Sequence, residues 1–410
     1  TYNAMKSYIT FLIAASLICI HAAPSVGQTF PSPPPLLFTG MDGILISDGG
    51  MEIPIWGYGL TANGYITVPG PLLEYETGDD VNLAFVNNSP ESHTIHLHGL
   101  DVDQANDGVP TTSFIVIQDE VGSYEFTASE PGTFLYHCHV TTTLHLTMGM
   151  YGMILVRHPG GVLFEGGPAY YSDAPLLFSD LEIATNLDPV QSFPFHDIRP
   201  DYFMVNGRSG SQLETGSSGI PGEPGTILSC PNGESLALRL GSMAYTLTKL
   251  IFPSELEAMC YMSDGRPLPT PFGVEELDIY PGERFTVLIS PDAEYDGTIE
   301  VQSWDMVNQE YVHSNFVRIR DAALNISAPQ IQEPLSLSIS PNPSRDFISV
   351  KSSDGRNLAD WTIYNTSGKI IAKGYSNTPS MQIDISLFAS GSYILESVNG
   401  DLKSRAQFAR

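Results

Sequence analysis

Hydrophobic residues in this chain alternate with polar ones in short runs that are separated by turn residues. Such alternation is typical of a β-strand with one buried face, because successive side chains of a strand point to opposite faces. Between residues 37 and 157 the pattern predicts strands at 43–47, 81–86, 113–117, 123–126, 132–136 and 152–156. Short strands at this spacing favour a β-sandwich of about 120 residues.

Two further sets of alternating runs follow. After a stretch rich in glycine, proline, aspartate and serine at 159–195, strands are predicted at 175–179, 202–205, 235–240, 276–279, 284–289, 298–301 and 315–319. After a polar linker, a third set is predicted at 337–340, 347–350, 361–364, 370–372 and 392–395. No long amphipathic helical pattern interrupts these runs, so the chain is expected to be all-β.

The N-terminus has the features of a secretory signal. Met5 and Lys6 precede an apolar run from Ile9 to Ile20, and small residues at 22–27 offer cleavage sites. The run is too short for a confident membrane span, and no other candidate is found, so we expect an exported protein without one. The expected organisation is a signal peptide at 1–28, two sandwiches at 29–162 and 163–321, a linker at 322–336 and a small β-domain at 337–410.

Charge supports the last of these boundaries. Residues 29–336 hold 40 acidic and 9 basic side chains, whereas residues 337–410 hold 6 acidic and 8 basic ones. The formal net charge of the whole chain is −28. A charge of this sign repels nucleic acid and anionic membranes, so we expect neither as a partner.

Six of the ten histidines lie in two short segments, His-Thr-Ile-His-Leu-His at 93–98 and His-Cys-His at 137–139 with a further histidine at 145. A blue-copper site uses one thiolate, two imidazoles and a weak axial thioether, because this set suits both oxidation states of copper. The four groups are present at His93, Cys138, His145 and Met150. The pattern therefore predicts a blue-copper site in the first sandwich.

Strand alternation predicts a second histidine site beside the first. His137 and His139 point to one face and Cys138 to the other, because residues two apart share a face. If the two segments form neighbouring strands, four imidazoles converge: His96, His98, His137 and His139. An oxidase needs a site that accepts one electron at a time, joined by a few covalent bonds to a second metal site such as this multi-histidine cluster.

Other interpretations of these residues were weighed. A single zinc site does not account for eight candidate ligands, and methionine is not a zinc ligand. His158, His196 and His313 stand alone and are interpreted as ordinary surface or core residues. Cys19 lies in the expected signal, and Cys230 and Cys260 can either pair in an oxidising compartment or stay as thiols.

At these residues the sequence resembles the multicopper oxidases. His93-x-x-His96-x-His98-Gly and His137-Cys138-His139 with His145 and Met150 resemble the two copper motifs of that family, and Val68-Pro-Gly-Pro and Asp107-Gly-Val-Pro resemble its flanking patterns. The resemblance implies Greek-key cupredoxin folds and copper as the cofactor. It implies one-electron oxidation of a small-molecule or metal-ion donor at a type 1 copper, held by His93, Cys138, His145 and Met150, with reduction of O2 at a cluster.

By the same resemblance, His96 would face a type 2 copper, and His98, His137 and His139 would face a type 3 pair or share the cluster. The chain departs from the family in having two extra residues between His139 and His145. It also lacks histidines where the second sandwich would complete the cluster: residues 241–247 read Gly-Ser-Met-Ala-Tyr-Thr-Leu. Because the family uses eight cluster histidines and four are present, we expect a homo-oligomer in which another chain supplies the rest.

Two alternatives to an oxidase stay open. The chain resembles copper nitrite reductases in its copper-poor second half, but Thr94 and Ile95 stand where those enzymes place an aspartate. A non-catalytic blue-copper carrier would need only the first four ligands and leave the other imidazoles unexplained. Asp101, Asp103 and Asp107 lie near the first motif and are candidates for binding cations or handling protons, and the negative charge favours cationic donors.

The tail resembles the C-terminal sorting domain of the type IX secretion system. The resemblance rests on Ile339-Ser-Pro-Asn-Pro, Ile363-Tyr-Asn-Thr-Ser-Gly-Lys and Ile383-Asp-Ile-Ser-Leu-Phe-Ala-Ser-Gly-Ser-Tyr. It implies a small β-sandwich, recognition by the type IX machinery and export through the outer membrane of a Gram-negative bacterium, with the protein released or attached to the cell surface. A small adhesive β-domain is the alternative.

Overall fold

The computed structural model describes residues 37–61, 63–189, 198–215, 224–291, 295–320, 337–340, 344–352, 357–365, 370–389, 392–399 and 402–410. The expected signal peptide at 1–28, the linker at 322–336 and His196 lie outside the described residues. The chain divides into two compact units, residues 1–323 and 324–410. Each unit is a β-structure with its own hydrophobic core, as the alternating pattern predicts.

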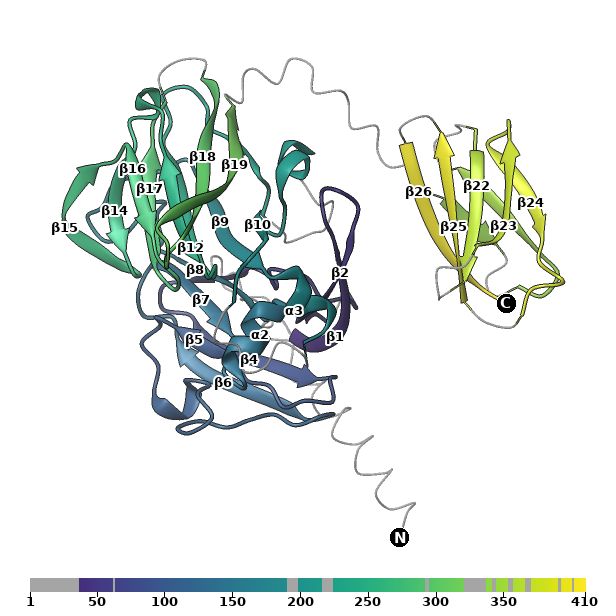
Figure 1. Ribbon diagram of the computed structural model, residues 1–410, viewed down its shortest axis with the longest axis horizontal. Helices are drawn as coiled ribbons and strands as arrows, with labels where there is room; N and C mark the ends of the chain where they lie inside the picture. Colours follow the sequence, from purple (N-terminus) through teal and green to yellow (C-terminus); the bar gives the residue numbers. More distant parts are fainter. Residues whose placement is uncertain are drawn as a thin grey trace, which may run out of the picture. The chain divides into compact units, whose positions relative to one another are not determined.

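The first unit begins with a sandwich of two four-stranded sheets (Figure 1). One sheet has the order β2-β1-β4-β6 and consists of β1 (Leu37–Ile46), β2 (Glu52–Leu60), β4 (Asp80–Asn87) and β6 (Val121–Thr127). The other has the order β3-β8-β7-β5 and consists of β3 (Leu73–Glu76), β5 (His96–His98), β7 (Gly132–His137) and β8 (Tyr151–Arg157). One core cluster, which includes Phe85 and Tyr136, fills the space between them.

The strand predicted at 113–117 is wrong. Only Val116 pairs, through an isolated bridge with His93. The rest of the segment makes contacts outside a sheet. The N–H of Ser113 donates to the carbonyl of Val109 at 2.8 Å, and the ring of Phe114 stacks on Tyr124. The segment therefore keeps its alternation of buried and exposed side chains without forming a ladder.

The second sandwich follows in the same unit. Its larger sheet has the order β10-β9-β12-β17-β14-β15 and consists of β9 (Ser172–Leu181), β10 (Tyr202–Val205), β12 (Leu236–Ser242), β14 (Met259–Ser263), β15 (Arg266–Gly273) and β17 (Arg284–Ile289). The facing sheet has the order β11-β19-β18-β13-β16 and consists of β11 (Ile227–Ser229), β13 (Leu247–Ile251), β16 (Glu276–Ile279), β18 (Asp296–Asp305) and β19 (Glu310–Arg320).

Helical segments in the first unit are short. They are η1 (Gln104–Asn106), α2 (Thr142–Met148), α3 (Ile183–Leu187), η2 (Gly210–Thr215) and η3 (Ser254–Leu256). The helix α2 occupies the loop after His139 that carries the two extra residues, and it packs against α3 and β9 (Figure 1). Among the described residues, no helix is long and apolar enough to cross a membrane.

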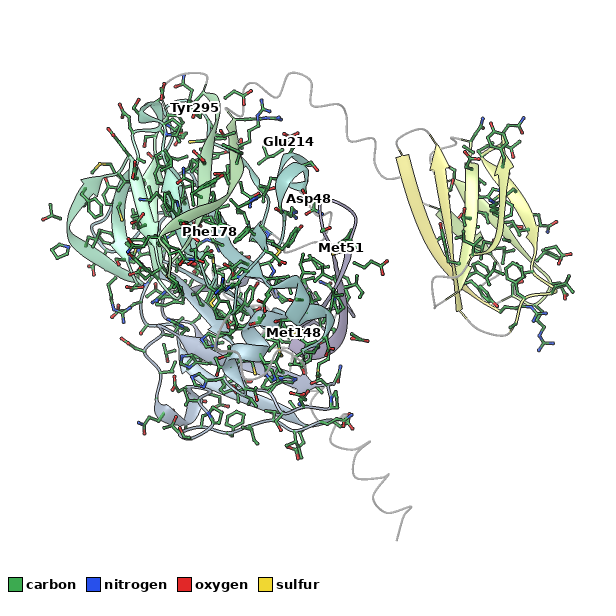
Figure 2. The ribbon with its side chains drawn as sticks, in the orientation of Figure 1. Asp48, Met51, Met148, Phe178, Glu214 and Tyr295 are labelled. Carbon is green, nitrogen blue, oxygen red and sulfur yellow. The ribbon has the colours of Figure 1, made fainter. Side chains whose placement is uncertain are left out.

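The two sandwiches share a hydrophobic contact. Residues of β2, β7 and β8, among them Ile55 and Leu135, form one buried cluster with residues of β9 and β10, among them Leu177 and Met204. Figure 2 labels Phe178, in the core of the second sandwich, and Met148, in the core of the first. Because burial of apolar area is the main stabilising contribution in folding, the junction holds the sandwiches as one body.

The two cysteines of the second sandwich are separate thiols. Cys230 and Cys260 are both buried, with each Sγ near a backbone carbonyl, that of Glu234 at 3.5 Å and that of Met262 at 3.7 Å. The disulfide that the sequence left open is therefore absent between these residues.

The second unit is a small sandwich with its own core around Ile363 and Leu395. One sheet has the order β20-β21-β24 and consists of β20 (Leu337–Ser340), β21 (Phe347–Ser352) and β24 (Ser380–Asp384). The other has the order β23-β22-β25-β26 and consists of β22 (Ala359–Asn365), β23 (Ile370–Ser376), β25 (Ser392–Asn399) and β26 (Leu402–Ala409). All five strands predicted here lie within observed ones.

Candidate metal centre

The four predicted blue-copper residues come from three parts of the first sandwich. His93 lies in the loop after β4, Cys138 directly follows β7, His145 lies on α2, and Met150 follows the end of α2. All four residues are fully buried, at 0 % exposure. The structure thus gathers them inside the sandwich, although His93 and Met150 are 57 positions apart in the sequence.

The thiol of Cys138 sits between the two imidazoles. Its Sγ lies 3.1 Å from Nδ1 of His145 and 3.6 Å from Nδ1 of His93. The backbone fixes the fourth residue: the N–H of Met150 donates to the carbonyl of His145 at 2.9 Å, and the N–H of Cys138 donates to the carbonyl of Met150 at 3.1 Å. Cys138, His145 and Met150 are therefore joined by two main-chain hydrogen bonds. Below, the blue group means these three residues with His93.

One loop orients both imidazoles from outside. Nε2 of His93 lies 2.5 Å from the hydroxyl of Ser89, and Nε2 of His145 lies 3.1 Å from the carboxylate of Glu91. The indole of Trp56 adds an edge contact to the His145 ring at 5.5 Å. With Nε2 occupied in each ring, Nδ1 is left for a metal, which is how outer contacts usually orient ligating histidines.

Burial sets the protonation of the blue group. It lowers the pKa of His93 to about 3, with a smaller contribution from His145, so this imidazole is neutral at neutral pH. Burial also lowers the pKa of His145, against the opposing effect of Glu91. Burial raises the pKa of the Cys138 thiol to about 11. A cation is therefore needed to stabilise the thiolate here, and a metal ion provides that charge.

The second histidine group forms on the neighbouring pair of strands. His96 lies opposite His137 in the antiparallel register of β5 and β7. The ligand nitrogens of His96, His98 and His137 all lie within 4.8 Å of one another. His139 is outside this set but adjacent to it, with its ring centroid 5.3 Å from that of His96. Below, the cluster group means these four histidines.

The position of His139 has a local cause. β7 ends at His137, so strand alternation does not continue to His139. The N–H of His139 instead donates to the hydroxyl of Thr94 at 3.0 Å, which ties it to the segment between the first two histidines of the other motif. Three imidazoles converge as strand geometry predicts, and the fourth flanks them.

The cluster group is less buried than the blue group. His96, His98 and His139 are half-buried, and only His137 is buried. Burial lowers the pKa of His137 to about 3 and that of His98 to about 4, and for His98 the charge of Arg284 adds to the effect. Their neutral nitrogens are therefore available to a metal at neutral pH.

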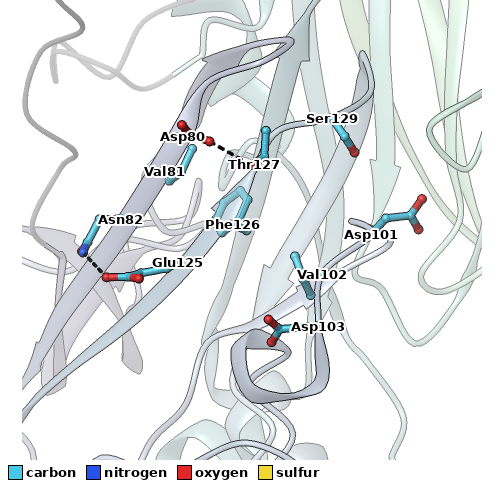
Figure 3. A pocket seen from close by; sticks show the side chains of 10 residues that line it. All are labelled: Asp80, Val81, Asn82, Asp101, Val102, Asp103, Glu125, Phe126, Thr127 and Ser129. Carbon is cyan, nitrogen blue, oxygen red and sulfur yellow. Dashed lines mark hydrogen bonds between the residues drawn. The ribbon is translucent and has the colours of Figure 1, made fainter.

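Asp107 is the only one of the three singled-out aspartates that contacts a histidine in the described structure. Nδ1 of His96 lies 2.7 Å from the backbone carbonyl of Asp107 and 3.2 Å from its carboxylate. Asp101 and Asp103 instead line a surface pocket of about 610 Å³, with Asp80 and Glu125 on its other side (Figure 3). Asp101 also pairs with Arg266 at 2.7 Å. Asp107 therefore orients His96, whereas the other two face solvent.

The second sandwich contributes no histidine to either group within its described residues, 163–189, 198–215, 224–291 and 295–320. His313 stacks on Phe203 at 5.3 Å, inside the second sandwich. His158 is half-buried and bonds to the neighbouring carbonyl of Pro159. At the His98 end, the second sandwich instead brings Arg284, which pairs with Asp264 at 2.9 Å.

Residue patterns missed several of these contacts. Glu91 carried a signal, because it lies two positions before His93 and thus on the same side of an extended segment. Ser89 and the partners from the second sandwich carried none, since they approach through tertiary packing. The helix α2 was also missed, because seven residues are too few for a clear periodicity.

Comparisons with known proteins match two regions of the chain to known families. Residues 57–161 match the family model of the multicopper oxidases, and residues 338–408 match that of the secretion system C-terminal sorting domain. Copper resistance protein A of Pseudomonas syringae pv. tomato is 28 % identical over 302 residues, which are 63 % of this chain and 47 % of that protein. The copper-containing nitrite reductase of Neisseria gonorrhoeae is 25 % identical over 191 residues, 46 % of each chain.

The fold has solved counterparts. The blue copper oxidase of Nitrosomonas europaea aligns with a TM-score of 0.56 and 24 % identity over 72 % of this chain and 87 % of that one. The first unit is thus built from cupredoxin-like sandwiches, as predicted. Residues 57–161 therefore carry a multicopper oxidase domain, and residues 338–408 carry a secretion-system sorting domain. It spans about half the length of the curated relatives that it matches.

Copper is the cofactor that this family implies, and the donor set fits it. A thiol and two neutral imidazoles converge in the blue group, where a buried thioether-bearing residue is held beside them. Soft sulfur with imidazole is the ligand set of blue copper. The cluster group offers imidazoles alone, which suit copper in either oxidation state.

Proposed function

We propose that this protein is an exported copper oxidoreductase of the laccase type, which oxidises a donor by one electron at a time and reduces O2. The observation that carries the proposal is the adjacency of the two groups. Cys138 of the blue group is flanked in sequence by His137 and His139 of the cluster group, so one peptide link joins them. A site that accepts electrons from a donor and is covalently linked to a separate histidine cluster suits an oxidase better than an electron carrier, because a carrier needs only the blue group.

In this proposal each residue keeps the role that the family resemblance implies. The type 1 copper ligands are His93, Cys138, His145 and Met150. His96 faces a type 2 copper, and His98, His137 and His139 face a type 3 pair or share the cluster. When bound, copper supplies the one-electron chemistry at the first group and the reduction of O2 at the second.

The chain's own residues prepare both groups. Complete burial of the blue group excludes water from the thiolate, which stabilises its bond to a soft metal. Ser89 and Glu91 hold the imidazoles with Nδ1 inward. At the cluster group, the carboxylate of Asp107 lies beside Nδ1 of His96, where it can hold a proton within reach of the site where O2 is reduced.

We further propose that a second copy of the chain completes the cluster. The family's cluster uses eight histidines, and this chain offers four. A two-fold contact between first sandwiches brings two sets of four together, because such an interface is self-complementary. Partial exposure of His96, His98 and His139 supports a site that is open to a partner.

Copper content and spectra of the mature protein test the proposal. We expect more than one copper per chain, intense blue absorption, a separate type 2 signal in paramagnetic resonance, and O2 consumption with an aromatic or metal-ion donor. About one copper per chain, all of it blue, would overturn the oxidase. Full O2 reduction by a protein that sediments strictly as a monomer would overturn completion by a second copy.

Nitrite reduction is the second candidate, because a copper-containing nitrite reductase is among the relatives. The residues argue against it, because Thr94 and Ile95 offer no carboxylate between the first two histidines of the motif. We expect nitrite turnover by the copper-loaded protein to stay at background while O2 is consumed.

Export follows from the sorting domain, which supports a secreted or surface location. We propose that the type IX machinery recognises residues 337–410 and carries the protein through the outer membrane of a Gram-negative cell. Deleting these residues should keep the protein inside a type IX-competent host, measured by immunoblotting of cell and medium fractions.

A further inference from the structure

The second sandwich hydrogen-bonds to the helix of the blue group through the side chain of Tyr245. Tyr245, in the loop between β12 and β13, donates its hydroxyl to the carbonyl of Thr143 on α2 at 3.0 Å. The hydroxyl of Thr147, one turn further along α2, lies 3.3 Å from the same Tyr245 oxygen. Tyr245 therefore contacts two successive turns of the helix that carries His145.

Tyr245 contacts the face of α2 that points away from the blue group. Residues two apart in an α-helix are separated by about 200° around its axis. Thr143 and Thr147 thus share one face, and His145, midway between them, projects from the other, toward Cys138. A contact at this face holds His145 in place from behind.

The helix α2 depends on such support. It has only seven residues, and its N-cap Thr141 has a positive φ of 43° and makes no side-chain capping bond. Isolated helices shorter than about 12 residues are marginal in water, because nucleation is costly and few internal bonds form. Packing against the second sandwich therefore decides how firmly His145 is held.

The loop that presents Tyr245 is itself anchored. The buried carboxylate of Asp180, on β9, accepts the N–H of Tyr245 at 2.9 Å, and it accepts the N–H and the hydroxyl of Thr246 at 3.0 and 2.7 Å. Asp180 is 1 % exposed. Three bonds to one buried carboxylate fix the backbone at Tyr245, so its ring has a defined position against α2.

We propose that Tyr245 is a positioning residue for the blue group, and that the second sandwich uses it to set the geometry of His145. The inference rests on the proposed type 1 site. It assigns a role to residues 241–247, where the sequence lacks the histidines that would complete a cluster. This loop supplies no metal ligand. Its Tyr245 instead holds α2 and therefore the imidazole of His145, and the bond from the Met150 N–H to the His145 carbonyl extends this support to Met150.

Tyr245→Phe removes the hydroxyl and keeps the ring. In the copper-free protein we expect amide hydrogen exchange at Gly149 and Met150, whose N–H groups bond to carbonyls of α2, to rise about fivefold, the ordinary effect of losing one hydrogen bond. In the copper-loaded protein we expect a changed reduction potential and a changed hyperfine splitting of the blue copper. Both readouts report geometry, and neither depends on turnover.

Tyr202→Phe is the matched control. Tyr202 also joins the sandwiches through its hydroxyl, which accepts the N–H of Asp48 at 3.2 Å, but it has no hydrogen bond to α2. We expect its exchange at 149–150 and its spectra to equal those of the unmodified protein. The proposal is overturned if Tyr245→Phe leaves exchange and potential unchanged, or if both variants change them equally.

The proposed function can fail separately. An unmodified protein that binds no blue copper would overturn the type 1 assignment, whereas the exchange comparison is made without copper and tests the contact of Tyr245 with α2 alone. Thermal unfolding of both copper-free variants checks that each is folded. If Tyr245→Phe does not fold, Thr147→Val removes the second contact of Tyr245 from the helix side, together with the bond of the Thr147 hydroxyl to the Thr143 carbonyl at 2.8 Å. Exchange at 149–150 should rise in this variant, and unchanged exchange there would overturn the proposal.

Discussion

The blue group and the cluster group lie on the same strand and differ in how much of each the chain completes. The blue group is fully buried, and contacts outside it hold its imidazoles. The cluster group is mostly half-buried, and the described residues of the second sandwich offer it Arg284 where a complete cluster would need histidines. The contrast fits our proposal of a preorganised blue site beside a cluster that a second copy of the chain completes.

Cys138→Ser should separate the two groups most sharply. Loss of the thiolate removes the soft ligand, so we expect blue absorption and donor oxidation to be abolished while the cluster group still binds copper. Copper per chain and visible absorption measure this. Cys260→Ser, which replaces a buried thiol of the second sandwich, should keep both properties. Blue colour in Cys138→Ser would contradict the assignment.

His137→Ala should have the opposite effect. His137 is the most buried member of the cluster group, so we expect at least about a hundredfold loss of O2 consumption with the blue absorption retained, since removing a ligand abolishes the site it holds. Oxygen-electrode rates and spectra measure the two outcomes. His313→Ala is the control and should consume O2 at the normal rate. Loss of blue colour in His137→Ala would show that the groups are not separate.

Glu91→Gln tests the outer contacts of the blue group. Gln keeps the size of the side chain but replaces the carboxylate that faces Nε2 of His145, so we expect roughly tenfold slower donor oxidation, as for other groups that orient metal ligands. Steady-state kinetics with one donor measure it. Glu120→Gln, at an exposed position nearby, should leave the rate unchanged. Equal rates for both variants would remove Glu91 from the site.

The smallest expected effect is on the thermal stability that depends on Asp180, the buried carboxylate that holds the loop of Tyr245. Burial raises the pKa of Asp180 to about 6, above the value of about 3.9 for an unfolded chain. A raised folded-state pKa contributes stability that is full below pH 4 and is lost as pH rises through 6. We expect Tm to fall by a few degrees over this window, and the fall to be smaller in Asp180→Asn. Parallel slopes for both proteins would contradict it.

Local patterns in the sequence predicted the blue group better than its surroundings. Alternation placed His137 and Cys138 on opposite faces, and the register of β5 and β7 places His96 opposite His137. The strand predicted at 113–117 failed because its hydrogen bonds go to a nearby loop. The hydrogen bonds of Tyr245 to α2 could not be predicted, because they depend on how the two sandwiches pack. The spacing of residues in the sequence does not determine that packing.

The main-chain hydrogen bonds from Met150 to His145 and from Cys138 to Met150 close the segment 138–150 into a loop whose two ends are bonded to each other. This segment is called the cassette here. Extra residues between its ligands can coil outward as α2 without moving its two ends apart. Such a cassette is transplantable: grafted between β7 and β8 equivalents of another scaffold, it would carry its ligand spacing with it. To form a blue site, the graft would need a second imidazole from the new scaffold, as His93 provides here, and it would lack the contact of Tyr245 with α2.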